Sequence, residues 1–190
     1  MKRILLALAL LAVSLPSAAA WQLDNQRSSL YFVSIKKNDV AEINHFSHLA
    51  GEYHKGRAKL SIDLSSVETG IDIRDKRVRQ HLFEVNRFAT ANVTMEVPEQ
   101  RVAELTAGNS LTLDAHATLS LHGTEKKLPT TLEVTRLADG SLMVANFRPV
   151  IVNAGDFDLA QGVKRLREIA GLPSISPAVP VQFTLFFTKE

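Results

Sequence analysis

The stretch LTLDAHATLSLH, residues Leu111–His122, decides the fold class of this chain. Its odd-numbered residues are all apolar (Leu or Ala), and its even-numbered residues are all polar. This period of two predicts a β-strand with one buried face. A helix would scatter the same leucines around its whole circumference, because it turns every 3.6 residues.

The alternation of Leu111–His122 recurs along the chain. Clear examples lie at 57–64, 91–97 and 181–188, and further strands are predicted at 30–35, 128–137 and 142–152. The last of these has apolar residues on both faces. Turn residues separate the strands at Gly108-Asn109, His122-Gly123 and Asp139-Gly140. Connections as short as these make neighbouring strands antiparallel.

Two charged segments interrupt the strands. Residues Asp72–Leu82 and Leu159–Ile169 have apolar residues at roughly helical spacing among basic ones. We expect both to be short helical inserts at the rim of the sheet, the second ending at Gly171 before Pro173.

Half a dozen or more one-sided strands must bury their apolar faces, and a closed barrel or a sandwich does so. The charged inserts, the 12 aromatic residues and the lack of aromatic girdles argue against an outer-membrane barrel, which would turn its apolar face to lipid. The fold class is therefore all-β, and residues 21–190 are expected to form one domain.

The first twenty residues have the pattern of a cleavable signal peptide. Lys2 and Arg3 precede an apolar run, and Pro16 and the small residues of Ala18–Ala20 follow it. We expect cleavage after Ala20, which would release an exported, soluble protein. The run is too short for a comfortable membrane span.

Charge and cysteine content exclude several classes of protein. The chain has 22 basic and 20 acidic residues, so loss of Lys2 and Arg3 leaves it formally neutral. Nucleic acid is therefore not an expected partner, because no basic stripe interleaved with aromatics remains. The chain has no cysteine, which excludes disulfides, thiolate metal sites and a cysteine nucleophile.

Several stretches resemble the YceI-like family. They are SLYFVSIKK (29–37), LSIDLSSVET (60–69), RDK (74–76) followed by Leu82-Phe83, ATLSLHGT (117–124), LEV (132–134) and DFDL (156–159), in the family's order. The resemblance implies an extended, lipocalin-like antiparallel β-barrel of about eight strands. It also implies a hydrophobic tunnel that binds a polyisoprenoid lipid or the tail of a quinone, in a periplasmic protein.

Twelve apolar residues are the predicted ligand-binding set of this tunnel. They are Phe32, Phe46, Leu60, Ile62, Val93, Met95, Leu113, Leu119, Phe147, Phe157, Phe183 and Leu185. The residues alone leave a cavity and a solid core equally open, since an eight-stranded barrel permits both. Small residues predicted to point inward, namely Ala58, Ala91, Ala115, Ala117 and Ala145, together with the resemblance favour a cavity.

The histidines raise a metal hypothesis. His45, His48 and His54 are close in sequence, but His45 and His48 would lie on opposite faces of a strand. No carboxylate or cysteine completes an obvious tetrahedral set, so we predict hydrogen-bonding surface histidines and no metal site.

A catalytic triad is also considered. Asp114, His116, Ser120 and His122 share the polar face of one strand. Alternate residues on such a face are about 7 Å apart, too far for direct proton relay. No Gly-x-Ser-x-Gly motif is present, and we predict no catalytic residue and no catalytic cofactor.

Three functions stay open at this point. The first is a periplasmic carrier for a polyisoprenoid or quinone. The second is an enzyme or redox partner that acts on a quinone head group through His45, His48 or Arg74. The third is a protein-interaction module with a solid core. A homodimer stays open, as does transient membrane contact through the basic run in 164–167. Arg74, Arg77 and Arg79 are read as a solvated face, since Asp72 and Asp75 nearly cancel their charge.

Overall fold

The computed structural model describes residues 20–189, so the predicted signal peptide lies outside the described residues apart from Ala20. The strands are β1 (Trp21–Leu23), β2 (Ser29–Lys36), β3 (Val40–Phe46), β4 (Leu49–His54), β5 (Arg57–Asp63), β6 (Val67–Glu68), β7 (Thr90–Glu96), β8 (Ser110–Leu121), β9 (Thr124–Arg136), β10 (Leu142–Asn146), β11 (Val150–Asn153) and β12 (Ala178–Lys189). The helices are α1 (Asp72–Arg77), α2 (Glu99–Ala103) and α3 (Ala160–Ile169), with the shorter helical turns η1 (Leu64–Ser66), η2 (Val78–Leu82) and η3 (Ala154–Phe157).

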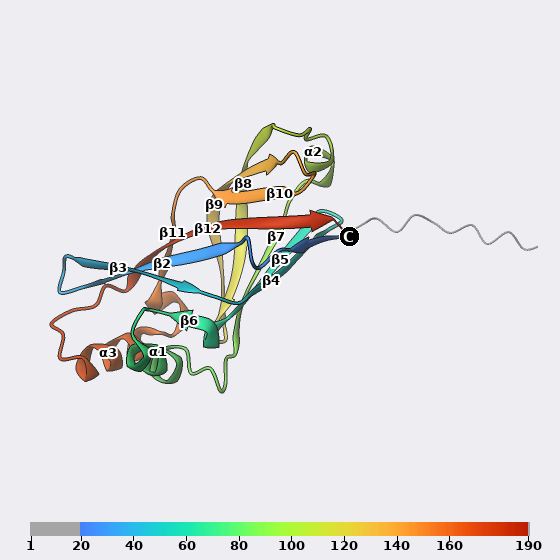
Figure 1. The fold of residues 1–190 in the computed structure, drawn as a ribbon. Coiled ribbons are helices and arrows are strands. Elements are labelled where there is room, and N and C mark those ends of the chain that lie inside the picture. Colours follow the sequence, from blue (N-terminus) through green and yellow to red (C-terminus); the bar gives the residue numbers. More distant parts are fainter. Residues whose placement is uncertain (1–19, 190) are drawn as a thin grey trace, which may run out of the picture.

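Eight of these strands close into an antiparallel barrel (Figure 1). The ring runs β1, β4, β5, β7, β8, β9, β10 and β12, and β12 closes it by pairing with β1, where Trp21 lies opposite Lys189. β2 and β3 continue from one edge of β12 beyond the ring, and β11 pairs with the opposite edge of β12. The predicted barrel of about eight strands is confirmed.

One predicted strand, 142–152, is broken into β10 and β11. Pro149 lies in the break, and a proline cannot donate to a strand ladder. The side chain of Asn146, 2% exposed, bridges the gap to β12. It donates to the Val181 carbonyl (3.0 Å) and accepts from the Phe183 amide (2.8 Å). This buried amide therefore replaces backbone bonds that the break removes.

Turn chemistry sets the register of the longest hairpin. β8 and β9 pair over twelve residues on β8, from Ser110 opposite Thr135 to Leu121 opposite Thr124. The two linking residues, His122 (φ 51°) and Gly123 (φ 79°), are both left-handed, as a tight two-residue hairpin requires. A side chain at Gly123 would also meet the Phe88 ring, because a Cβ there would lie 3.2 Å from it.

Helical segments lie at the two ends of the barrel (Figure 1). α1 runs directly into η2, and α3 packs against η2 at one end, while α2 lies at the other. A Cβ on Gly162 of α3 would lie 2.7 Å from the His81 carbonyl oxygen, so only glycine permits this approach. Both predicted helical inserts are confirmed, and α2 was not predicted. None of the helices in residues 20–189 has the length and apolar character needed to cross a bilayer.

Strands β3 and β4 were not predicted either. Polar residues on the inner face hide the alternation in β3, and Gly51 interrupts the apolar face of β4 between Leu49 and Tyr53. Asn44 is only 2% exposed, and Glu42 lies on the same side of β3. β3 is also an edge over most of its length. Beyond β2 it pairs only with β6, at His45 and Phe46, so among the described residues Val40–Asn44 have no strand partner on that side.

Candidate functional site: an apolar cavity along the barrel

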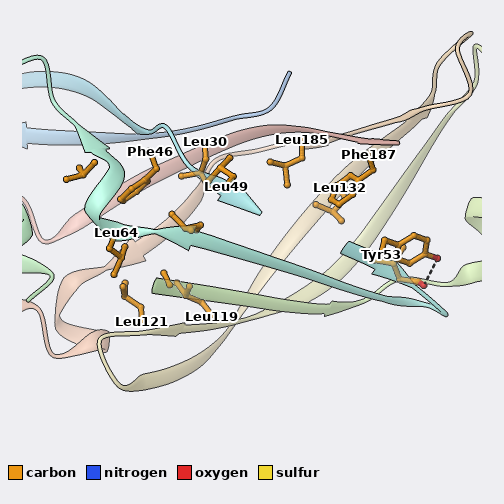
Figure 2. Packing of buried hydrophobic residues seen from close by; sticks show 14 of the residues in the cluster. Leu30, Phe46, Leu49, Tyr53, Leu64, Leu119, Leu121, Leu132, Leu185 and Phe187 are labelled. Carbon is orange, nitrogen blue, oxygen red and sulfur yellow. Dashed lines mark hydrogen bonds between the residues drawn. The ribbon is translucent and has the colours of Figure 1, made fainter. Parts of the chain in front are cut away.

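The inward faces of the strands line a cavity of about 260 Å³. Leucine, valine, phenylalanine and alanine side chains from most strands of the barrel line it. η2 contributes Leu82, α2 contributes Val102 and α3 contributes Val163, so helical residues from both ends also line it. Figure 2 shows buried members of the surrounding cluster, with Leu30, Leu185 and Phe187 on one wall and Leu119 and Leu121 on another. The volume is close to the lower end of the range for small-molecule sites.

Nine of the twelve predicted residues line this cavity. They are Phe32, Phe46, Leu60, Ile62, Val93, Met95, Leu119, Phe183 and Leu185. That they contact a ligand stays a prediction. Leu113 and Phe157 are buried, at 5% and 0% exposure, but lie outside the lining.

The prediction that Phe147 faces the tunnel was wrong. Its side chain is 61% exposed and lies outside the cavity lining. β10 places Leu142, Val144 and Asn146 on the inner side, so the odd-numbered residues of this segment face outward. Ala145 was assigned inward by the same error of phase. The cause is that 142–152 is apolar on both faces, so alternation could not select one.

Several lining residues escaped the sequence analysis. Tyr53 belongs to the unpredicted β4. Leu82 and Val163 belong to segments assigned to the rim, and Phe83 directly follows the first of these. The helical spacing of Val78 with Leu82, and of Val163 with Leu166, was a usable signal, because it marks the faces that turn toward the core.

Polar groups are scarce in the cavity wall. The Tyr53 hydroxyl donates to the Val97 carbonyl at 3.3 Å, and burial raises the pKa of Tyr53 to about 12, with a smaller contribution from Glu99. Thr130 Oγ1 has no hydrogen-bond partner among the described residues. Lys59 contributes to the wall, but its ammonium pairs with Glu52 at 2.7 Å. A bound molecule would therefore be held by apolar contact.

A charged cluster lies on the inner side of the β2–β3 hairpin, beyond Phe32 and Phe46. Glu42 accepts from Lys36 Nζ at 2.8 Å and from Arg74 Nη1 at 2.7 Å. The hydrogen bond from Lys36, aided by Arg74, lowers the pKa of the Glu42 carboxyl. Arg74 also donates from Nε to Thr69 Oγ1 at 2.7 Å, so its donors are used within the fold. The cluster ties α1 to β3.

The histidines do not converge. No group of three or more His, Cys, Asp or Glu side chains within residues 20–189 is arranged to hold a metal ion. His45 Nε2 lies 3.2 Å from Glu68 Oε2 on the neighbouring strand, and His48 is exposed. Asp114 is bonded by Thr131 at 2.7 Å across the β8–β9 pair. No hydrogen bond in the described part of the chain joins it to Ser120 or to a histidine.

The comparisons with known proteins agree with this geometry. A family model described as the YceI-like domain matches residues 21–187. The chain belongs to the YceI-like family. The match spans every strand of the barrel except the last residues of β12. A search of curated proteins finds no match.

Solved structures include relatives of this YceI-like chain. A polyisoprenoid binding domain from Saccharophagus degradans, implicated in plant cell wall breakdown, is 42% identical, with a TM-score of 0.88 over 90% of this chain and 99% of that one. BcnA of Burkholderia cenocepacia is 16% identical, with a TM-score of 0.68 over 87% and 99% of the two chains. The second likeness concerns the fold alone.

Proposed function

We propose that this YceI-like protein holds a polyisoprenoid lipid or quinone tail in the barrel cavity and acts as a periplasmic carrier rather than a catalyst. One observation carries the proposal, namely an interior void whose wall is almost wholly apolar. A solid-core interaction module would have no such void. The 42% identical relative, which is a polyisoprenoid binding domain, supports the choice of ligand. The signal-peptide pattern in residues 1–20 supports export.

Burial energy is sufficient for such a ligand. At about 0.8 kcal/mol per buried carbon, one five-carbon isoprene unit contributes about 4 kcal/mol. A few units outweigh the entropy lost on ordering the tail and on association. The one charged residue among the described residues of the cavity wall, Lys59, is already paired with Glu52 and offers no free partner to a head group. We therefore expect the protein to select for the length and shape of the lipid tail more than for its head group.

Mass spectrometry tests the proposal directly. Protein purified from its native periplasm should release a prenyl lipid or quinone into an organic extract, in near-stoichiometric amount. Recovery of protein with no lipid, both from the native source and after incubation with a prenyl quinone, would overturn the proposal.

A pair of variants ties binding to the cavity. Ala117 lines the void on β8, whereas Ala50 is exposed on β4. Ala117→Phe should fill part of the space and reduce the bound lipid severalfold, while Ala50→Phe should leave it unchanged. Circular dichroism checks that both variants fold. Equal lipid content in the two variants would place the ligand elsewhere.

A further inference from the structure

α1, η2 and α3, at one end of the barrel, carry a net positive charge on a neutral protein, with the exposed Asp156 and Asp158 as acidic neighbours just before α3. Residues 71–83 and 159–169 contain seven basic and three acidic residues, a formal charge of +4. The chain from Trp21 onward has 20 basic and 20 acidic residues, so the remainder has a charge of −4. We call residues 71–83 and 159–169 the helical cap. Its charge is not evident from the composition of the whole chain.

α1 presents a distinct outward face. Asp75 and Val78 are buried at 8% and 7% exposure, and they point toward the barrel. At 100° per residue, Ile73, Lys76 and Arg77 lie on the opposite side of the helix. Ile73 is 52% exposed on this outward side.

Asp75 does not neutralise this outward face. Its Oδ1 accepts hydrogen bonds from the Thr69 amide (2.9 Å) and the Thr69 hydroxyl (2.5 Å), on the inner side of α1. Lys76 and Arg77 form no ion pair with any described residue. Asp75 therefore does not oppose the outward cations, and the exposed Asp72, one turn before Lys76, is the acidic residue of α1 that remains near them.

α3 repeats the arrangement. Val163 and Leu166 pack against the core, so Lys164 and Arg165 lie toward the outer side. Lys164 is exposed and forms no ion pair with a described residue. Arg165 forms one long ion pair, with 3.9 Å between its Nη1 and Glu168 Oε2. A second exposed isoleucine, Ile71 at 50%, immediately precedes α1. The cap thus combines protruding apolar side chains with several unpaired cations.

We propose that the helical cap is a docking surface for an anionic phospholipid bilayer. Exposed isoleucines can enter the headgroup region while lysine and arginine pair with lipid phosphates, as in interfacial helices. The same cap supplies Leu82, Leu159 and Val163 to the cavity wall, so docking would place that end of the cavity at the membrane. The proposal goes beyond the ligand and can be tested whether or not the cavity holds one.

Vesicle flotation tests the docking surface, with protein from Trp21 onward, which contains the whole barrel. Vesicles of phosphatidylcholine with about one third phosphatidylglycerol should bind the protein, and pure phosphatidylcholine should bind it much less. Each basic residue near an anionic surface contributes roughly fivefold to partitioning. The double variant Lys76→Ala/Arg77→Ala should therefore bind roughly 25-fold more weakly. Raising the salt concentration should release the wild-type protein.

Two further variants separate membrane docking from charge alone. Ile73→Ser keeps every charge and should still reduce vesicle binding severalfold. Lys55→Ala/Arg101→Ala removes two exposed cations at the opposite end, in the β4–β5 turn and in α2, and should change binding less than twofold. Lys55, Ile73, Lys76 and Arg101 are exposed, and Arg77 is half-buried on the outward side of α1. Thermal unfolding checks that each variant folds.

Three results would overturn the proposal. One is equal binding to neutral and anionic vesicles, and another is equal loss in the cap variant and the opposite-end control. The third is retention of full vesicle binding by Ile73→Ser together with equally tight binding to soluble polyglutamate, which would identify a general polyanion surface. Lipid content measured by mass spectrometry in the same variants distinguishes a failure of docking from a failure of the carrier function.

Discussion

Two leucines on one face of β8 offer a quantitative test of the cavity. Leu119 lines the void and Leu113 does not, although both are buried, at 8% and 5% exposure. Replacing a buried leucine by alanine costs the transfer energy of the lost atoms plus a term for the new empty space, in total about 2–5 kcal/mol. At Leu119 part of that space already exists, so fewer packing contacts are lost.

We therefore expect Leu119→Ala to cost about 2–3 kcal/mol in the lipid-free protein and Leu113→Ala about 3–5 kcal/mol. Urea unfolding at neutral pH measures both, with m-values checked for equality so that the midpoints report stability. Adding a prenyl lipid should stabilise Leu119→Ala at least as much as the wild type, because a flexible tail can fill the added space. If Leu119→Ala costs as much as Leu113→Ala without lipid, no void adjoins Leu119 and the reasoning fails.

Other predictions concern the charged cluster, the buried Tyr53 and the contact between α3 and η2. Arg74→Met should destabilise the protein by about 1–2 kcal/mol, since it breaks charge-assisted hydrogen bonds between α1 and β3. Because the pKa of Glu42 is lowered in the folded protein, its carboxylate contributes to the free energy of unfolding at neutral pH, and this contribution is lost as the pH falls below the ordinary pKa of 4.5. Arg74→Met should therefore lose less stability than the wild type between pH 7 and pH 3, as measured by urea titrations at the two pH values. Tyr53→Phe should cost about 1 kcal/mol, because it removes the hydrogen bond to the Val97 carbonyl. The raised pKa of Tyr53 predicts that the wild type loses stability between pH 10 and about 12, and Tyr53→Phe should abolish this loss in urea unfolding across that range. Gly162→Ala should cost about 1–3 kcal/mol in thermal unfolding, because α3 must move away from η2.

Matched variants serve as controls for these changes. Glu96→Gln removes an exposed carboxylate paired with Arg57 and should leave the acid dependence almost unchanged. Gln161→Ala changes the exposed neighbour of Gly162 and should stay within about 0.5 kcal/mol of the wild type. An acid profile identical in Arg74→Met and wild type, or a Gly162→Ala protein as stable as Gln161→Ala, would contradict the roles given to Arg74 and Gly162.

The parts of the fold that follow from local pattern were predictable. β8 and β5 alternate cleanly because one face meets the cavity and the other meets water, and α3 shows its helical spacing for the same reason. The parts set by tertiary context were not. Asn44 and Asn146 are polar yet buried, because each bonds to neighbouring groups that no sequence pattern reveals. Such residues hide the alternation of β3 and the break after β10.

The candidate site was predictable to a similar extent. Residues on clean strands, such as Ile62 and Leu119, were placed correctly in the wall, whereas Phe147 was not, because pairing with β9 and β12 sets the phase of β10. The side of α1 on which Asp75 lies was also beyond the sequence, since its hydrogen bonds to Thr69 hold it on the inner side.

The unpaired edge of β3 has a bearing on solubility. An open strand invites pairing with another molecule and so starts aggregation. Here Glu42 and Lys36 are charged groups turned toward the inside of that hairpin, and any chain that extended the sheet would have to bury them. The charged side chain of Glu42, which binds Arg74 of α1, therefore also disfavours the addition of a strand from another molecule to the β2–β3 hairpin.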